Sequence, residues 1–145
     1  MKGGFISTWH LGLKRVKMKF RLMDLLACPI DKTFPLKLIV LEEKNVVGET
    51  KEVKTPVCEL YCSLASKTVK ELAMGEIDCN VCYSKEIVSG VLVCPKCSRW
   101  YPIVDEIPHM LPDELRNPRE DIPFLEKNKK SLPKNLVVSV KPSHL

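Results

Sequence analysis

The segment from Val93 to Arg116 constrains the fold of this chain most, because it joins a metal-binding motif to an extended apolar stretch. The motif is Cys94-Pro95-Lys96-Cys97, in which two thiols are separated by two residues, a spacing typical of zinc knuckles. Pro102, Pro108 and Pro112 follow and exclude a helix over the apolar stretch. We therefore expect strands next to a metal site.

The cysteine content favours metal thiolates over a disulfide framework. The 145 residues include seven cysteines, which cannot all pair, and the N-terminus lacks the charge order and cleavage site of a secretory signal. Cys79 and Cys82 repeat the spacing of Cys94 and Cys97. No run of 18 apolar residues occurs, so we expect a soluble, cytoplasmic protein without a membrane partner.

The charge differs in sign between the body of the chain and its two ends. Residues 1–21 hold six Lys or Arg and no acid, and residues 116–145 hold seven bases and three acids. The formal net charge of +5 therefore leaves −5 on residues 22–115. Because binding to a phosphate backbone needs clustered positive charge, a nucleic-acid role would depend on the two ends.

Apolar periodicity predicts a mixture of helices and strands. Leucines from Leu22 onward recur at helical spacing until Pro29, which predicts a short helix that ends near Cys28. Residues 35–41 alternate as a strand with Leu36, Leu38 and Val40 on one face. Residues 57–74 carry an apolar stripe at helical spacing, followed by Gly75, and predict the longest helix.

The second half of the chain predicts three more extended segments. Residues 86–93 are rich in β-forming residues, and Ser89-Gly90 within them allows either a bulge or a tight turn. Residues 100–104 and 107–111 are expected to be strands around a turn at Asp105-Glu106. Beyond Arg116, prolines and lysines predict a flexible tail, in which residues 136–140 could add a strand or dock on a partner.

Four segments together resemble the small zinc-ribbon activator subunits of class I methyltransferases. This is the family of the tRNA methyltransferase activator subunit, also called the multifunctional methyltransferase subunit, and the chain looks like an archaeal-like member. The matching segments are L-L-A-C-P (25–29), P-L-K-L (35–38), G-V-L-V-C-P-K-C (90–97) and R-W-Y-P-I-V-D-E-I-P-H-M-L-P (99–112).

The resemblance implies a noncatalytic activating subunit rather than an enzyme. Members of this family neither bind the methyl donor nor catalyse, and they form heterodimers with SAM-dependent methyltransferases that modify tRNA, rRNA and a translation release factor. They dock edge to edge on the catalytic subunit and cover an apolar surface of it. Association with tRNA or rRNA is then indirect, and no residue is expected to be catalytic.

The resemblance also implies an α+β fold, a small zinc-ribbon-like antiparallel sheet with a helical insertion and flexible basic termini. Residues 1–17 are expected to be an N-terminal extension. Residues 18–116 form the zinc-ribbon-like domain, with the helical insertion at about 42–85. Residues 117–145 form the basic, proline-containing tail.

Three arrangements of zinc ligands remain open. The family's zinc site maps onto Cys28, Asp31, Cys94 and Cys97, with a carboxylate where a second thiolate is common. Cys58, Cys62, Cys79 and Cys82 could hold a second zinc in the insertion. Alternatively, Cys79 and Cys82 share one ion with Cys94 and Cys97, which requires a hairpin at Ser89-Gly90 because a straight strand separates the pairs by about 25 Å. One or two zinc ions are therefore expected.

Apolar residues beside a strand edge are the candidate partner-binding surface. About half of them must fill the small core, and the remainder would form an exposed patch next to unpaired backbone groups. The candidates are Phe34, Leu36, Trp100, Tyr101, Ile103, Ile107, Pro108, Met110 and Leu111.

Two other classes of function compete with the activator. A zinc-ribbon nucleic-acid-binding protein would use the two basic ends. A rubredoxin-like iron protein would use Cys79, Cys82, Cys94 and Cys97, and would be coloured. An enzyme is disfavoured because His109 is a lone histidine on an extended segment and no glycine-rich phosphate loop occurs.

Overall fold

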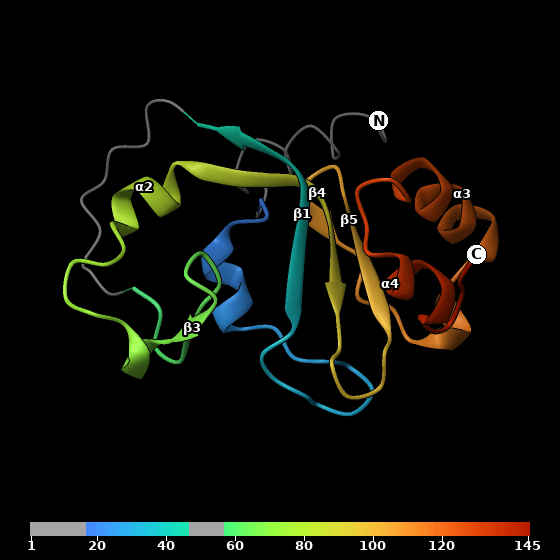
Figure 1. Cartoon of the computed structure of the whole chain (residues 1–145), viewed down its shortest axis with the longest axis horizontal. Helices are drawn as coiled ribbons and strands as arrows, with labels where there is room; N and C mark the ends of the chain where they lie inside the picture. Colours follow the sequence, from blue (N-terminus) through green and yellow to red (C-terminus); the bar gives the residue numbers. More distant parts are fainter. Residues whose placement is uncertain (1–16, 47–56) are drawn as a thin grey trace, which may run out of the picture.

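A four-stranded antiparallel sheet lies at the centre of the computed structural model, which describes residues 17–46 and 57–145. Except for Lys17, the predicted N-terminal extension, residues 1–17, lies outside these ranges. The strands are β1 (Lys37–Asn45), β4 (Lys85–Val93), β5 (Trp100–Val104) and β6 (Ile107–Pro108), in the order β1-β4-β5-β6 (Figure 1). The α+β class and the antiparallel sheet are confirmed.

Strand β4 is continuous through the point where the sequence allowed a bulge or a turn. Its register against β1 shifts between Val40 and Glu42, so that Leu41 has no partner, and it shifts again after Glu42. Gly90 lies at this bulge, where a Cβ atom would be 2.7 Å from the carbonyl oxygen of Ile39. A residue with a side chain therefore cannot replace Gly90 unless the two strands separate.

Side chains alternate between the two faces of the sheet along each strand, and each face carries a core of its own. One face carries the ribbon core, in which Leu92 and Tyr101 pack against the N-terminal segment. The other face carries the C-terminal core, in which Val91 and Trp100 pack against helices. The ribbon core consists of Met18, Phe20, Met23, Cys28, Leu36, Cys82, Ile87, Leu92, Cys94, Tyr101 and Ile103, and the C-terminal core of Val91, Trp100, Leu125, Leu132, Leu136, Val137 and Val140.

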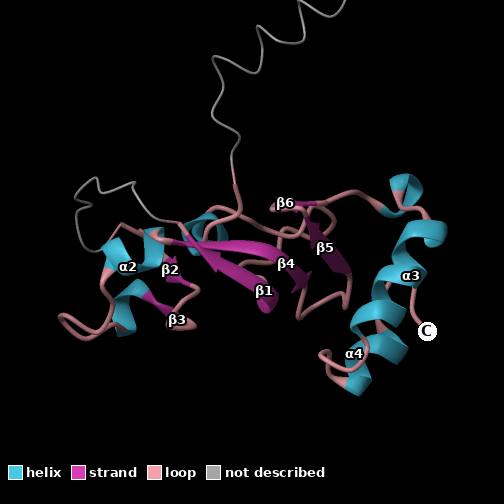
Figure 2. Cartoon of the chain, turned by 90° about the horizontal axis from the view of Figure 1, so that it is seen from above, coloured by secondary structure: helices cyan, strands magenta, loops and turns pink. Residues whose placement is uncertain are grey.

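The predicted flexible C-terminal tail is wrong, because two helices, α3 (Pro118–Asn128) and α4 (Lys134–Ser139), cover one face of the sheet (Figure 2). Helix α3 has standard initiation features: Asn117 accepts a hydrogen bond from Arg119 N–H, Pro118 occupies the first turn, and acids follow. Burial of leucines and valines against Trp100 outweighs Pro123 within the helix. A short 3₁₀ helix, η3 (Asp113–Leu115), precedes α3.

The predicted long helix over residues 57–74 is also wrong. This part of the insertion contains β2 (Tyr61–Cys62), β3 (Lys67–Thr68) and the 3₁₀ helix η2 (Val69–Glu71), and α2 (Cys79–Tyr83) follows. Ser66 has a left-handed φ of 54°, and Thr68 forms a capping box with Glu71, so local bonds replace a continuous helix. The apolar stripe is not a buried face either, since Leu60 and Met74 are exposed.

The N-terminal segment that precedes the ribbon is part of the fold from Lys17 onward. Met18 is fully buried, its N–H donates to the carbonyl of Glu106, and its carbonyl accepts from Ile87 N–H. The predicted helix that ends near Cys28 is a shorter 3₁₀ helix, η1 (Phe20–Asp24). Over the described residues, no helix has the length and apolar character needed to cross a membrane.

Candidate metal centre

Two backbone loops of the same geometry hold the first set of predicted ligands. In one, Cys28 N–H donates to Thr33 and Lys32 N–H donates to Cys28. In the other, Cys94 N–H donates to Arg99 and Ser98 N–H donates to Cys94. Lys32 and Ser98 both have left-handed φ angles, 63° and 60°. Asp31 therefore occupies in the first knuckle the position that Cys97 occupies in the second.

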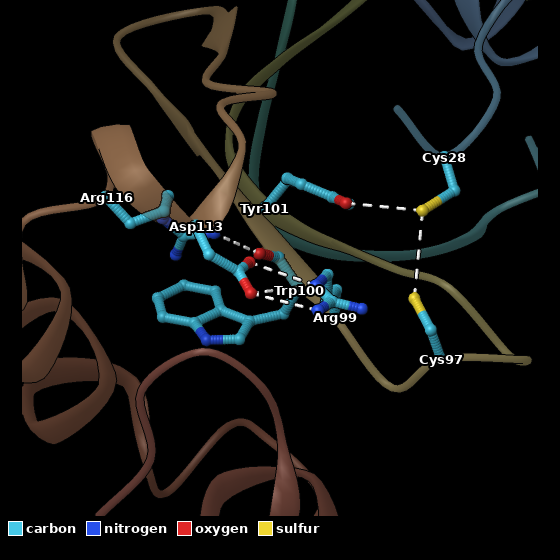
Figure 3. A network of polar contacts seen from close by, with 7 residues as sticks. All are labelled: Cys28, Cys97, Arg99, Trp100, Tyr101, Asp113 and Arg116. Carbon is cyan, nitrogen blue, oxygen red and sulfur yellow. Dashed lines mark hydrogen bonds and ion pairs between the residues drawn. The ribbon is translucent and has the colours of Figure 1, made fainter. Parts of the chain in front are cut away.

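The ligand atoms of Cys28, Asp31, Cys94 and Cys97 lie within 4.8 Å of one another, and they are the only such group found among the described residues. The Sγ atoms of Cys28 and Cys97 are 3.8 Å apart (Figure 3), and the Sγ atom of Cys94 is 3.6 Å from each carboxylate oxygen of Asp31. Cys28 and Cys94 are buried, whereas Asp31 and Cys97 are half-buried. This cluster could hold a metal ion, and three sulfurs with one carboxylate suit zinc.

The electrostatics of the cluster lower the pKa of Asp31 and of Cys94, whereas burial raises the pKa of Cys97. A hydrogen bond from Thr33 N–H holds the pKa of Asp31 well below its usual range, and hydrogen bonds from the thiols of Cys28 and Cys94 add to this effect. Burial acts to raise the pKa of Cys94, but the backbone N–H groups of Cys97 and Lys96 outweigh it, and the pKa falls. N–H groups that point at sulfur stabilise a thiolate, which is the form that binds metal.

A network of polar and aromatic contacts joins the knuckles and β5 to η3 and to Arg116 at its end (Figure 3). Arg99 binds the carboxylate of Asp113 with two nitrogens, and Arg116 lies 4.6 Å above the ring of Trp100 and donates to its carbonyl. The hydroxyl of Tyr101 lies 3.3 Å from the Sγ atom of Cys28. Sequence reasoning missed this network. The available signal was the charged residue Arg99 between the second knuckle and the apolar strand that follows it.

The remaining cysteines do not join this cluster. Because β4 runs without a turn between Cys82 and Cys94, its nine residues span about 30 Å, and the arrangement with Cys79, Cys82, Cys94 and Cys97 around one ion is excluded. The rubredoxin-like iron site is wrong for the same reason. Cys58, Cys62, Cys79 and Cys82 lie together in the insertion, although their sulfurs are not within the 4.8 Å that unites the first set.

The structure divides the predicted partner-binding residues into core and surface. Leu36, Tyr101 and Ile103 are in the ribbon core and Trp100 is in the C-terminal core, so these four are the candidates that fill the core, and the expectation that Leu36 is exposed is wrong. These residues are divided between the two faces of the sheet, and both faces are buried because helices α3 and α4 cover the second one. Phe34, Ile107 and Leu111 are exposed, whereas Pro108 and Met110 are half-buried.

The open edge of the sheet also differs from the expected one. The outer side of β5 is covered, since Trp100 N–H donates to Lys141, His109 N–H donates to Pro102, and β6 pairs with Ile103 and Val104. In contrast, β1 has β4 as its one strand neighbour in the sheet that the structure describes. Residues 38–41 of β1 are apolar and half-buried. Within the described part of the chain, the long strand edge without a second strand neighbour is therefore β1.

Comparisons with known proteins point to one family. The model of the family described as Trm112p-like protein matches residues 19–106, a range that contains both knuckles and strands β1, β4 and β5. A solved structure described as the E. cuniculi Mtq2-Trm112 complex, responsible for methylation of the eRF1 translation termination factor, contains a similar chain. It is 20% identical, with a TM-score of 0.45, and the match covers 65% of this chain and 95% of that chain. No curated protein matches.

Proposed function

Because the chain belongs to the Trm112p-like family, which consists of noncatalytic methyltransferase activators, we propose that it activates and stabilises SAM-dependent methyltransferases of the translation machinery. The observation that carries this proposal is the family match over residues 19–106, which includes the whole candidate metal centre. The substrates would be tRNA, rRNA or a release factor, bound by the catalytic subunit, and the complex would be cytoplasmic.

The metal of the ribbon would be a structural zinc held by Cys28, Asp31, Cys94 and Cys97. A four-coordinate site closed by protein ligands has no position for a substrate or a reactive water. The ion would instead fix the two knuckles at one end of the sheet and so set the position of β1 relative to β4 and β5. Its role in activation is therefore to hold the docking surface in shape.

The docking surface that the geometry supports best is the open edge of β1. A strand of the methyltransferase would add to this edge through backbone hydrogen bonds, and the apolar side chains at 38–41 would contact the partner on either side. Phe34, which is exposed directly before β1, would extend this contact. Ile107, Pro108, Met110 and Leu111 lie at the opposite, β6 end of the sheet and form the alternative contact.

Affinity isolation of the tagged full-length protein from its own cells tests the proposal. We expect a SAM-dependent methyltransferase to be retained in a one-to-one complex. If extracts repeatedly yield the protein without any methyltransferase, the activator function is wrong.

Leu41 offers a matched pair of variants for the docking edge. It has no register partner on β4, so Leu41→Pro removes a backbone N–H of β1 at a position where the register assigns no β1–β4 pair, whereas Leu41→Ala keeps that N–H. We expect Leu41→Pro to weaken the complex at least about tenfold relative to Leu41→Ala, by loss of one well-placed contact. If Ile107→Asp with Leu111→Asp disrupts the complex instead, the partner binds at the β6 end.

The nucleic-acid alternative makes a different prediction. The lysines of the C-terminal region are exposed on α3, α4 and the turns around them rather than on a flexible tail. Direct RNA binding by the isolated protein should fall steeply as salt is raised. Under the activator proposal, RNA binding requires the catalytic subunit.

A further inference from the structure

The insertion has almost no apolar interior of its own. Among residues 57–84, the buried side chains are Cys62, Ser63, Cys79 and Cys82. Regular structure there amounts to two strands of two residues, a 3₁₀ helix of three and an α-helix of five. Segments of this size that lack an apolar core are usually stabilised by disulfides or a metal ion. The question is therefore what stabilises a segment whose interior consists mainly of thiols.

The four cysteines of the insertion come in two pairs from two separately anchored segments. Cys58 and Cys62 flank backbone that the carboxylate of Asp24 holds, since it accepts from the N–H groups of residues 59, 60 and 61. Cys79 and Cys82 lie three residues apart on α2, and so on one side of that helix. Two thiol pairs on two segments are the ligand set of structural zinc sites.

A cavity of about 440 Å³ lies between these segments. Cys58, Cys62 and Cys79 are part of its wall, and the rest of its lining is mostly apolar, with Val69, Leu72 and Ile77 among the lining residues. Among residues 17–46 and 57–145, no carboxylate or imidazole lines the cavity. A space bounded by thiols and aliphatic groups selects a soft cation that thiolates bind, and it does not suit Mg²⁺ or Ca²⁺, which require oxygen ligands.

We propose that Cys58, Cys62, Cys79 and Cys82 form a second, structural zinc site that cross-links the two halves of the insertion. Each thiol gives up a proton when its sulfur binds the ion, and no oxidant or reductant takes part. Tetrahedral coordination at about 2.3 Å per sulfur brings the sulfurs to roughly 3.8 Å from one another. Since these sulfurs lie farther apart in the described structure than those of the ribbon, zinc binding draws the two segments together over the cavity.

Disulfide formation is the competing use of the same thiols. All seven cysteines are free in the structure, and the odd number leaves at least one thiol unpaired in any disulfide scheme. Paired thiols and zinc thiolates differ in mass, since each disulfide removes two hydrogens and a bound ion adds the mass of zinc. Mass therefore separates the two possibilities in a single sample.

Native mass spectrometry of the full-length protein, purified without reducing agent and then supplied with zinc alone, tests the second site. We expect two zinc ions per chain, and one in the Cys79→Ser/Cys82→Ser variant. Ser66→Ala, an exposed position in the same insertion, is the matched control and should keep two. One zinc in the wild type, two in the double variant, or a wild-type mass lowered by two hydrogens per disulfide would overturn the proposal.

Cobalt substitution of the wild-type protein gives a second measurement that does not depend on how a variant folds. Two equivalents of Co²⁺ should bind, and the second should add sulfur-to-cobalt charge-transfer absorption typical of tetrahedral thiolate ligation. Saturation of this absorption at one equivalent would contradict a second site. The zinc count is measured without a methyltransferase, so its failure is distinguishable from a failure of the proposed activator function.

Discussion

The two cysteine-bearing regions of this protein differ in what positions their ligands. In the ribbon, paired knuckle hydrogen bonds and a sheet with a core on each face bring four ligand atoms within 4.8 Å of one another. In the insertion, short elements surround a cavity and the buried side chains are mostly thiols. Similar cysteine spacings therefore occur in one region that the backbone pre-organises and in another that it does not.

Cysteine spacing alone therefore does not define a metal site. The ribbon ligand atoms lie within 4.8 Å of one another without an ion, so zinc would add stability to a formed site. The four thiols of the insertion do not come that close to one another in the described structure, so the order of the insertion would depend on the cross-link itself. The experiments below test whether the stability of the two regions differs in this way.

Removal of the ribbon zinc ligands should have the largest effect. Cys94→Ser/Cys97→Ser would lose the metal-binding free energy of the proposed ribbon zinc, and we expect a lower and less cooperative unfolding transition by circular dichroism. Cys79→Ser/Cys82→Ser should retain a cooperative transition, because the C-terminal core is unchanged and Cys82 is the one residue of the ribbon core that the variant alters. Equal loss of cooperativity in the two variants would contradict the contrast between the regions.

Truncation of Trp100 should have the next largest effect, and this effect should be confined to the C-terminal core between the sheet and helices α3 and α4. Trp100 is fully buried, its ring stacks on Phe124 at 5.8 Å, and its indole N–H donates to the carbonyl of Ser143 at 2.9 Å. We expect Trp100→Ala to lower the free energy of unfolding by about 3–5 kcal/mol.

Denaturant unfolding measures this loss, and hydrogen exchange shows where it occurs. Amides of α3 and α4 should exchange faster in Trp100→Ala, while those of residues 57–84 keep their wild-type rates. Trp100→Phe, which retains a stacking ring, is the control and should cost clearly less. Faster exchange across the insertion would show that the two regions are coupled more tightly than the packing indicates.

The parts of the fold that the sequence predicts correctly are those set by local patterns. Alternation over residues 35–41 and 100–104 identifies strands because side chains on a strand have a period of two, and Asp105-Glu106 forms the predicted turn. Each knuckle is likewise a local loop with its own hydrogen bonds, but the grouping of Cys28, Asp31, Cys94 and Cys97 came from the family resemblance, because the sequence alone left three arrangements open.

The failures arise where distant contacts override local patterns. The stripe over residues 57–74 suggested a helix, but Asp24, more than 30 residues earlier in the chain, binds three successive N–H groups and fixes an irregular loop. The C-terminal prolines and lysines suggested a tail, but the apolar side of Trp100 on the sheet provides a surface that orders α3 and α4. Asp24 and Trp100 lie outside the segments that they order, so the local sequence pattern of those segments does not reveal either contact.

Asp24 joins the two regions, so its substitution should sharpen their difference. Burial acts to raise the pKa of Asp24, but three backbone N–H groups and Arg21 outweigh it and lower the pKa below its ordinary value of 3.8. We expect Asp24→Asn to cost about 2–3 kcal/mol, as for hydrogen bonds to a charged group, with faster hydrogen exchange at residues 59–61.

The lowered pKa of Asp24 also predicts how the stability difference between the wild type and Asp24→Asn changes with pH. Because the folded pKa lies below the unfolded one, the carboxylate stabilises the fold fully above pH 3.8 and loses this effect as pH falls through the folded pKa. The stability difference between wild type and Asp24→Asn should therefore shrink in acid. A constant difference down to pH 2 would show that the charge of Asp24 is not what holds the insertion.

The smallest expected effect tests the knuckle geometry directly. Lys32 adopts a left-handed φ of 63°, which is unfavourable for a residue with a side chain. Lys32→Gly should relieve this strain and raise the free energy of unfolding by about 0.5–1 kcal/mol. Lys32→Ala keeps the Cβ atom and should not raise the free energy of unfolding, which thermal unfolding measures. Equal stability of the two variants would show that the left-handed φ of Lys32 carries no strain.

The most direct test of the activator function is transfer of a labelled methyl group from SAM to the substrate of the co-isolated methyltransferase. The catalytic subunit alone should be weakly active or unstable, this protein alone should transfer nothing, and the two together should give full activity. Leu41→Pro should lower the activity of the mixture more than Leu41→Ala does. Equal activity of the catalytic subunit with and without this protein would contradict the proposed function.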